Sequence, residues 1–326
     1  MELENIARRI REFEGLTRKK QISGITSIFE SVKAEYKNCI VGFGDDAAVM
    51  DVDGDDYLLF AADGVWGKIV DASPWWAGYS SVLVNVNDIA AMGGRPLAMV
   101  DVLSTSDENT FNDILVGIRD GIAKFGVPVV GGHLHPDTSY TSISVAILGT
   151  VKKDCVLRSD TAKEHDSIIA AVDLDGRVGP NSRYSWDSTT TKTASEVQRM
   201  YQTLVKVGRL KTATACKDIS NPGIIGTLGM MLEVSGVGAD IDLKNIPIPE
   251  NMELGQWLLV HPATAFILTV PPGNEDVVID CFEKVGMTAH VIGEITGTSA
   301  LNIYEGNNSA TVFDFKKDAI TGITMK

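Results

Sequence analysis

Segments with the residue pattern of β-strands alternate with helix-like segments along most of this chain. Short apolar, β-branched runs predict strands, and runs with an apolar residue every three to four positions predict helices. In the first half, strands are predicted at 38–50, 57–62, 97–103, 127–130 and 142–151, and helices at 74–92 and 108–125. In the second half, strands are predicted at 168–172, 238–242, 264–270 and 289–295, and helices at 190–210, 222–235 and 274–285. This order predicts a mixed α/β (α+β) fold in two lobes.

A polar stretch at 152–166 separates the two halves. A length of 326 residues fits about two domains of roughly 150 residues each, so we predict domains at 37–152 and 153–326. Residues 1–36 are predicted to form a separate helical arm, which carries the basic cluster TRKK at 17–20. Two interpretations of this cluster stay open: the solvated end of a helix, or a mobile arm that folds over bound phosphates. The irregular stretch 179–191 is predicted to be a flexible substrate loop.

The composition excludes several classes of partner. The formal net charge is −14 and the pI is about 4.8, so the long-range field opposes binding to nucleic acid or to an anionic membrane. No apolar run approaches the roughly 18–20 residues of a membrane span, and the first residues lack a signal-peptide pattern. The four cysteines are scattered without metal-ligand spacing. We therefore expect a cytoplasmic protein with reduced cysteines.

Acidic side chains recur where apolar segments give way to small residues. Asp45 and Asp46 lie in GDDAAV at 44–49, Asp63 in AADG at 61–64, Asp88 in NDIAAMGG at 87–94, and Asp218 in KDIS at 217–220. Neighbours on an extended chain point to opposite sides, so one of the first pair faces the site and the other caps the turn. Each aspartate alone fits a turn cap or a solvated position. Four similar settings together favour Mg²⁺ held against phosphate oxygens.

Other nucleotide-binding patterns are absent from the sequence. There is no GxxxxGK[ST] loop, no GxGxxG after a strand and no protein-kinase motif set. The remaining way to bind ATP is through Mg²⁺ ions held by aspartates. His133 and His135 have alternating strand spacing that zinc ligands could use. With no cysteine nearby, we favour a hydrogen-bonding role for them beside phosphate or magnesium-bound water.

The order of these motifs resembles the aminoimidazole-ribonucleotide-synthetase superfamily over roughly residues 38–300. Its members include thiamine-monophosphate kinase, selenophosphate synthetase and a hydrogenase maturation protein. Within the superfamily the sequence is most similar to the archaeal synthetase-related group called methanogenesis marker protein 2. The resemblance implies a two-domain synthetase-like fold, with an N-terminal mixed-sheet domain that forms a dimer and a C-terminal α/β domain. It also implies ATP and Mg²⁺ in a cleft near the dimer interface.

Residue by residue, the resemblance assigns metal binding to four aspartates. Asp46 matches the metal-binding aspartate of the kinase pattern GDDAA(V/L). Asp63 matches the aspartate of its TDT strand end, and Asp88 matches that of SDIAAMG. The pattern DISDG matches 218–222, where Asp218 is kept and Asn221 replaces the second aspartate. The loss of that acidic residue argues against thiamine monophosphate as the substrate.

Two further segments differ from, or add to, the kinase pattern. The kinase TRSG segment matches 157–159 and makes Arg158 a candidate phosphate contact. Where the kinase has GGD, this chain has Gly131, Gly132 and His133, as in the GGH of selenophosphate synthetase. The reactive cysteine of that synthetase has no counterpart before the basic cluster, so selenium chemistry is not expected.

The sequence therefore predicts an ATP- and Mg²⁺-dependent enzyme that transfers a phosphoryl group to a small-molecule acceptor and forms a homodimer. The alternatives are a thiamine-monophosphate kinase, or a nucleotide-binding maturation or accessory protein without turnover of its own. Nucleotide contacts are assigned to Asp46, Asp63, Asp88, Gly131, Gly132, Arg158, Lys19 and Lys20, the metal to Asp46, Asp63, Asp88 and Asp218, and the reacting end to Asp218, Asn221 and His133.

Overall fold

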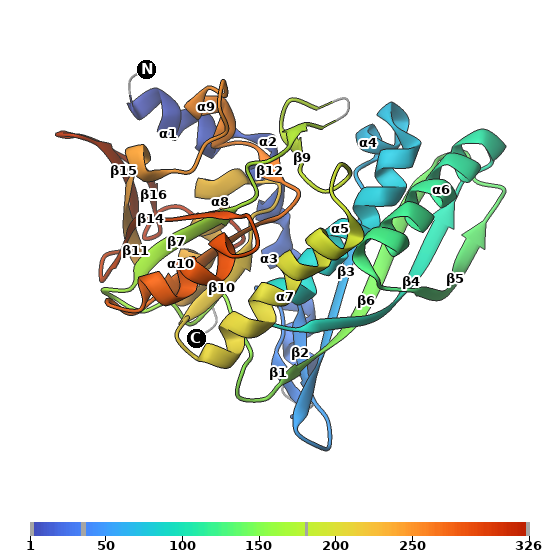
Figure 1. Cartoon of the computed structure of the whole chain (residues 1–326), viewed down its shortest axis with the longest axis horizontal. Helices are drawn as coiled ribbons and strands as arrows, with labels where there is room; N and C mark the ends of the chain where they lie inside the picture. The colour runs from blue at the N-terminus through green and yellow to red at the C-terminus, as the bar shows by residue number, and fades with distance from the viewer. Residues whose placement is uncertain (1–2, 34–36, 180–181, 324–326) are drawn as a thin grey trace.

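The computed structural model describes residues 3–33, 37–179 and 182–323 and contains two large mixed sheets (Figure 1). The first sheet has the strand order β1-β2-β3-β6-β4-β5. Only β4 and β5 pair in parallel, and the other neighbours are antiparallel. Its strands are β1 (Cys39–Val41), β2 (Ala48–Asp51), β3 (Asp56–Gly64), β4 (Arg95–Ser104), β5 (Val129–His135) and β6 (Ser142–Lys152).

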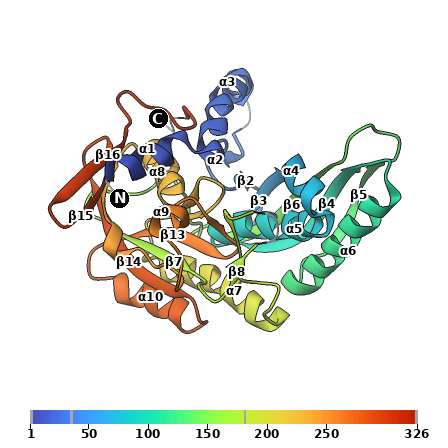
Figure 2. The same cartoon turned by 90° about the horizontal axis from the view of Figure 1, so that it is seen from above.

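Helices cover one face of this first sheet. They are α4 (Gly67–Ala72), α5 (Pro74–Ala91) and α6 (Glu108–Phe125). α5 packs directly on β3, β4 and β6, and α6 packs beside α5 (Figure 2). Pro74 occupies the first turn of α5, where its missing N–H costs nothing. Gly93 follows the helix with a φ of +70°. Glycine adopts this left-handed conformation without steric strain, and it ends the helix there.

The second large sheet has the order β10-β13-β7-β14-β11-β15-β16. Its strands are β7 (Ser167–Val172), β10 (Ala215–Asp218), β11 (Gly238–Asp242), β13 (Ala265–Val270), β14 (Thr288–Thr296), β15 (Ala300–Glu305) and β16 (Asn308–Asp314). A small sheet beside it contains β8 (Arg177–Val178), β9 (Ser185–Asp187) and β12 (His261–Pro262). The two large sheets confirm the predicted two-domain mixed α/β fold.

Both faces of the second sheet are covered, and the views in Figures 1 and 2 agree on the layers. One face packs on α7 (Ala194–Leu210) and α10 (Glu275–Glu283), and the other on α8 (Gly223–Ser235) and α1 (Leu3–Glu12). In β7, Ile169 and Ala171 belong to the hydrophobic core that includes residues of α7 and α10, whereas Ile168 and Ala170 belong to the core that includes residues of α1 and α8. A strand buried on both faces needs apolar residues at every position, which explains why β7 does not alternate. Shorter helical turns are η2 (Leu243–Asn245) and α9 (Leu254–Trp257).

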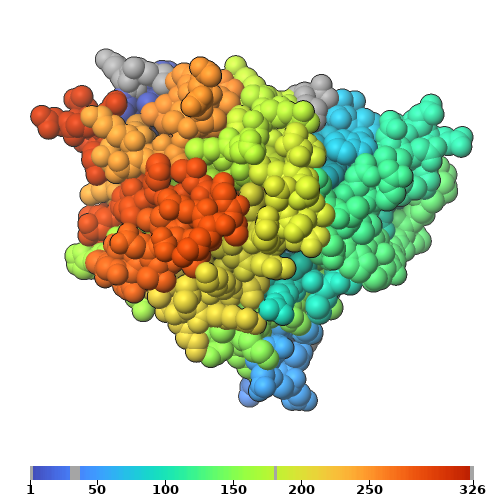
Figure 3. All heavy atoms as spheres, in the orientation of Figure 1, coloured from blue at the N-terminus to red at the C-terminus, as the bar shows by residue number. Residues whose placement is uncertain are grey.

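The N-terminal segment packs across both halves. Beyond α1, which packs on β16, it continues through α2 (Glu14–Thr17), η1 (Arg18–Gln21) and α3 (Ile22–Lys33). The space-filling view in Figure 3 shows the part of the chain coloured light blue to green against the C-terminal half, in yellow to red, and some of the N-terminal segment, in dark blue, on the far side of that half. α6 and α7 face each other between the two halves. None of the described helices has the length and apolar character needed to cross a bilayer.

Three segments differ from the sequence-based predictions. The strand predicted at 38–50 is two strands, β1 and β2, because residues 42–47 form the turn that carries the acidic pair. The strand predicted at 127–130 is β5, an edge strand that is exposed from Val130 onwards and includes the two glycines and His133. The predicted flexible loop 179–191 contains β9, whose three residues are buried. Residues 180–181 of that loop lie outside the described residues.

Candidate functional site

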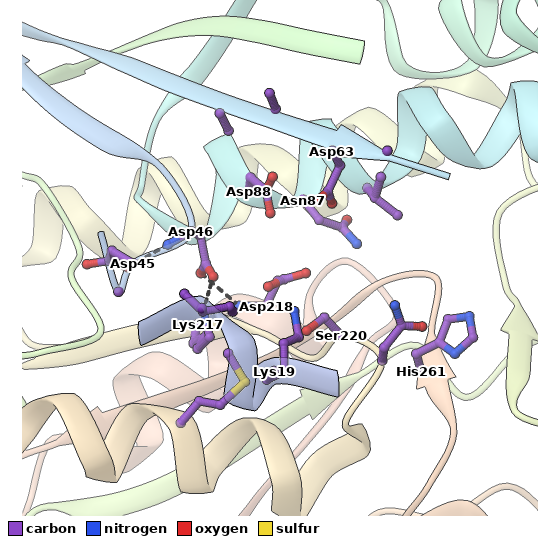
Figure 4. Close-up of a pocket in the computed structure, with 18 of the residues that line it drawn as sticks. Lys19, Asp45, Asp46, Asp63, Asn87, Asp88, Lys217, Asp218, Ser220 and His261 are labelled. Atoms are coloured by element: carbon purple, nitrogen blue, oxygen red, sulfur yellow. Dashed lines mark hydrogen bonds and ion pairs between the residues drawn. The ribbon is translucent and has the colours of Figure 1, made fainter. Parts of the chain in front are cut away.

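A cavity of about 930 Å³ lies where the first sheet meets β10 of the second. The turn between β1 and β2, the end of β3, the last turns of α5 and the end of β10 all contribute to its wall. Figure 4 shows Asp46, Asp63, Asp88 and Asp218 around a common centre, although they come from four separate elements. The structure therefore gathers the four predicted metal-binding aspartates in one cavity.

Three of these aspartates form a compact cluster. One carboxylate oxygen from each of Asp46, Asp88 and Asp218 lies within 4.8 Å of the other two. Asp63 lines the same cavity beside this cluster. Three hard oxygen donors at this spacing are a suitable set of ligands for a divalent cation such as Mg²⁺.

Lys217 is the main counter-charge of the cluster, a role that its sequence context did not predict. Its ammonium group forms an ion pair with Asp46, and both side chains are almost fully buried. Asp46 also accepts a hydrogen bond from the backbone N–H of Asp218 at 3.3 Å. Burial alone would lower the pKa of Lys217, but the charges of Asp46, Asp218 and Asp45 outweigh it and raise that pKa. The lysine therefore stays charged.

The cationic side chains around the cavity do not neutralise all of its carboxylates. Burial, followed by the negative charges of its neighbours, raises the pKa of Asp88 well above its usual value, and burial and Asp46 do the same for Asp218. The cavity wall carries five aspartates against Arg18, Lys19 and Lys217, a formal excess of two negative charges. One divalent cation would balance this excess, so the residues present fit a metal ion.

Asp45 has the structural role expected of one member of the acidic pair. Its carboxylate accepts hydrogen bonds from the backbone N–H groups of Asp46 at 2.9 Å and Ser159 at 3.0 Å. Burial, and then the charge of Asp46, raise the pKa of Asp45 to about 6. These bonds tie the β1–β2 turn to the segment between the two sheets and leave Asp46 to face the cluster.

Asn87 fixes the position of its neighbour Asp88 relative to the second sheet. The Asn87 side chain donates to the carbonyl of Ala263 at 3.1 Å and accepts from the Tyr201 hydroxyl at 2.7 Å. The amide is 3% exposed. Because α5 carries Asp88 and the second sheet carries Asp218, this buried network helps set the spacing between the two carboxylates.

The basic cluster at 17–20 places two of its three charged residues on the cavity wall. Arg18 and Lys19 line the cavity, whereas Lys20 is exposed and outside the lining. Burial, and then the charge of Lys217, lower the pKa of Lys19, while Asp63 and Asp218 partly offset this effect. Asn221, predicted at the reacting end, also lines the cavity.

Gly15 allows the arm to approach this closely. A Cβ atom at Gly15 would lie 2.4 Å from the carbonyl oxygen of Asn221 and 2.8 Å from the Phe13 ring. Backbone cannot move away easily, so we expect Gly15→Ala to destabilise the protein by about 1–3 kcal/mol, measured by chemical unfolding. Gly24→Ala is the matched control, because a Cβ atom there meets nothing within 4 Å. Equal stabilities of the two variants would contradict this role of Gly15.

Besides Lys20, four predicted residues do not line this cavity in the single chain. Arg158 is engaged by Asp160, with Nε–Oδ1 and Nη2–Oδ2 distances of 2.8 and 2.5 Å, and it is absent from the lining. Gly131, Gly132 and His133 lie on β5 at the far edge of the first sheet. They are separated from the aspartates because β5 pairs with β4 and not with β3.

The fold and this acidic cavity define a two-domain α/β protein with a carboxylate-rich cavity between its two large sheets. Family models match residues 44–151 as "AIR synthase related protein, N-terminal domain" and residues 167–305 as "AIR synthase related protein, C-terminal domain". An uncharacterized protein of Methanocaldococcus jannaschii is 47% identical over 99% of this chain and 100% of its own length. The chain belongs to the AIR synthase related proteins.

Solved structures share the fold at low sequence identity. T. maritima PurL complexed with FGAR superposes with a TM-score of 0.75 at 17% identity, covering 95% of this chain and 52% of PurL. This chain therefore spans about half the length of that protein. AaThiL complexed with AMPPCP and TMP superposes with a TM-score of 0.65 at 18% identity, covering 89% of this chain and 96% of AaThiL.

Proposed function

We propose that this protein is an ATP- and Mg²⁺-dependent enzyme that transfers a phosphoryl group to a small-molecule acceptor. The observation that carries the proposal is the cluster of carboxylate oxygens from Asp46, Asp88 and Asp218 within 4.8 Å in a large cavity. An excess of buried negative charge favours Mg²⁺ and the polyphosphate that it brings. The related AaThiL was solved with the nucleotide analogue AMPPCP, which supports a nucleotide in this fold.

The residues have distinct roles in this proposal. Asp46, Asp63, Asp88 and Asp218 hold the metal, which neutralises phosphate charge when bound. Lys19 faces the phosphate oxygens, and catalysis comes from positioning and charge neutralisation without a covalent nucleophile. An apolar part of the cavity receives the purine base; its side chains are Ile22, Phe29, Phe43, Met50 and Phe60.

Thiamine monophosphate is the second candidate acceptor. Its support is that AaThiL, which was solved with TMP, is matched over 96% of its length, whereas PurL is matched over about half. Asn221 stands where the kinase pattern has an aspartate, so this candidate requires the site to work with one acidic residue fewer. A coupled assay with thiamine monophosphate, ATP and Mg²⁺ decides between this acceptor and another.

Calorimetry with a non-hydrolysable ATP analogue tests the main proposal. We expect binding with Mg²⁺ and little binding after chelation, because the aspartates repel phosphate unless a cation lies between them. No binding under either condition would reject the proposal. Binding without any ATP turnover in the presence of candidate acceptors would instead favour the nucleotide-binding accessory role.

We also propose that the protein is a cytoplasmic homodimer built through the first sheet. The face opposite α5 carries exposed apolar side chains, with Val100 45% and Val102 44% exposed. His133 is on the same face, because it pairs with Val102 in the β4–β5 register. A second copy on this face would bury the apolar patch and bring β5 into an interface. The four free cysteines suit a reducing compartment.

Val102→Asp should convert the dimer to a monomer, because it places a charge in the apolar face of the sheet. Light scattering coupled to size-exclusion chromatography measures the mass directly. Leu115→Asp is the matched control, since Leu115 is 40% exposed on α6, which lies on the other face. A wild-type monomer, or a Val102→Asp variant that is still a dimer, would contradict this interface.

A further inference from the structure

A second, smaller cavity of about 280 Å³ adjoins the acidic cavity. The two share wall residues that include Arg18, Trp66 and His261. In Figure 4, His261 lies on the side of the aspartates opposite Asp45. The small cavity is therefore next to the acidic centre and away from the acidic turn. Its volume is near the lower limit of small-molecule sites, about 300 Å³, and suits one ring with a substituent.

Aromatic rings form much of the wall of this second cavity. Phe13, Trp66, Trp76 and Tyr184 all line it. The rings of Phe13 and Tyr184 are 5.0 Å apart in an edge-to-face arrangement, which fixes one side of the cavity. Rigid aromatic walls favour a flat ligand, because stacked and edge-on ring contacts add to the area buried.

The charge of the second cavity is opposite to that of the first. The Arg18 guanidinium lies 5.6 Å and the Lys68 ammonium 4.3 Å from the centre of the Trp66 ring. Glu14, the one carboxylate among the described lining residues, is 3.7 Å from Lys68. Arg18 has no carboxylate partner within the described part of the chain. It is therefore available to a ligand.

His261 adds a neutral polar group to the shared wall. Burial, and then the charge of Arg18, lower the pKa of His261 to about 4, so the imidazole is uncharged near pH 7. It can therefore hydrogen-bond to a ligand without adding charge, and Arg18 provides the main attraction for an anion.

The apolar end of the large cavity leaves the small cavity free for a second substrate. Phe29 and Phe43 stack with ring centres 6.2 Å apart, and Phe43 precedes the acidic pair by two residues. A purine placed there directs its phosphates across the aspartates and towards Asn221 and His261. Both of these residues line the small cavity.

We propose that the small cavity is the acceptor subsite and binds a planar ring compound that carries an anionic group. The ring lies among Trp66, Trp76 and Tyr184, and the anionic group pairs with Arg18. This assignment rests on the proposed phosphoryl-transfer function, because it takes the acidic cavity to be the nucleotide site. Neutral sugars and flexible aliphatic acceptors lack one or both of the matching features.

Three small probes test this subsite by calorimetry on the full chain with Mg²⁺ and the ATP analogue already bound. Phenyl phosphate has both the ring and the charge, cyclohexyl phosphate has only the charge, and phenol has only the ring. We expect millimolar binding of phenyl phosphate, as is usual for so small a ligand, and at least about tenfold weaker binding of the other two. Benzoate should bind as well, and a comparison with phenyl phosphate shows which anion is preferred.

Arg18→Gln should weaken phenyl phosphate binding by about tenfold or more, because it removes the paired charge. Trp66→Leu should remove the preference for phenyl over cyclohexyl phosphate. The exposed residue Arg199 on α7 provides the control Arg199→Gln, which should bind all probes as the wild type does.

The subsite is wrong if the analogue binds but phenyl phosphate does not, or binds no better than cyclohexyl phosphate and phenol. It is also wrong if phenyl phosphate displaces the analogue, since the nucleotide then occupies the small cavity. In either case the proposed function stands, because analogue binding is measured separately. Failure of the analogue itself to bind would reject the proposed function and the acceptor role with it.

Discussion

Asp88→Asn should weaken binding of the Mg²⁺–ATP analogue by more than about tenfold, because it removes one of the three clustered carboxylates that we propose bind Mg²⁺. The same change should stabilise the metal-free protein. Asp88 is half-buried beside Asp63, Asp218 and Asp46. Desolvation, and then the charges of these neighbours, raise its pKa, and the amide removes that repulsion without changing the shape. Calorimetry measures the loss of affinity, and thermal unfolding in a chelator measures the gain in stability.

These opposite effects distinguish a metal ligand from a residue that merely supports the fold. A supporting residue would lose both stability and binding when replaced. Asp113→Asn is the matched control, since Asp113 is an exposed carboxylate on α6, and it should change neither quantity. Unchanged nucleotide affinity in Asp88→Asn would show that Asp88 is not a ligand.

The aspartate cluster was predictable from sequence because each member belongs to a short local pattern. Asp46, Asp63, Asp88 and Asp218 all lie at or near the end of a strand or helix, where a carboxylate is unusual beside apolar residues. Their convergence in one cavity depends on how α5 packs on the second sheet. The sequence contains no local signal for that packing.

Lys217 illustrates a residue whose role the sequence obscures. Next to an aspartate at the end of a short segment, a lysine is usually solvated, yet here it is 4% exposed and pairs with Asp46. The available signal was its place in the strand ACKD at 215–218, directly after two small apolar residues. A charged residue in a strand buried at all four positions requires a partner.

Burial of polar segments and of strand edges was the least predictable part of the fold. The stretch around β9 is rich in serine and threonine, but Asp187 satisfies its backbone by accepting from the N–H groups of Thr189 and Thr190. Conversely, β5 is apolar at its start but exposed because it is the last strand of its sheet. Both properties depend on tertiary neighbours that no local pattern specifies.

Lys217→Met should destabilise the metal-free protein by about 3–5 kcal/mol, the usual result of removing one partner from a buried ion pair. The methionine fills similar space, so the loss comes from charge: Asp46, Asp218 and Asp45 remain buried without their cation. Thermal or chemical unfolding in a chelator measures the effect. Lys206→Met, at an exposed position of α7, is the matched control and should leave stability unchanged.

Mg²⁺ should restore much of the stability that Lys217→Met loses, and should stabilise this variant more than the wild type. The cation and the lysine ammonium neutralise the same carboxylates, so each is worth more when the other is absent. Titration of the melting temperature with Mg²⁺ therefore reports whether the buried aspartates accept a metal ion in the folded chain. An equal Mg²⁺ response in the variant and the wild type would show that Lys217 and the metal do not share these ligands.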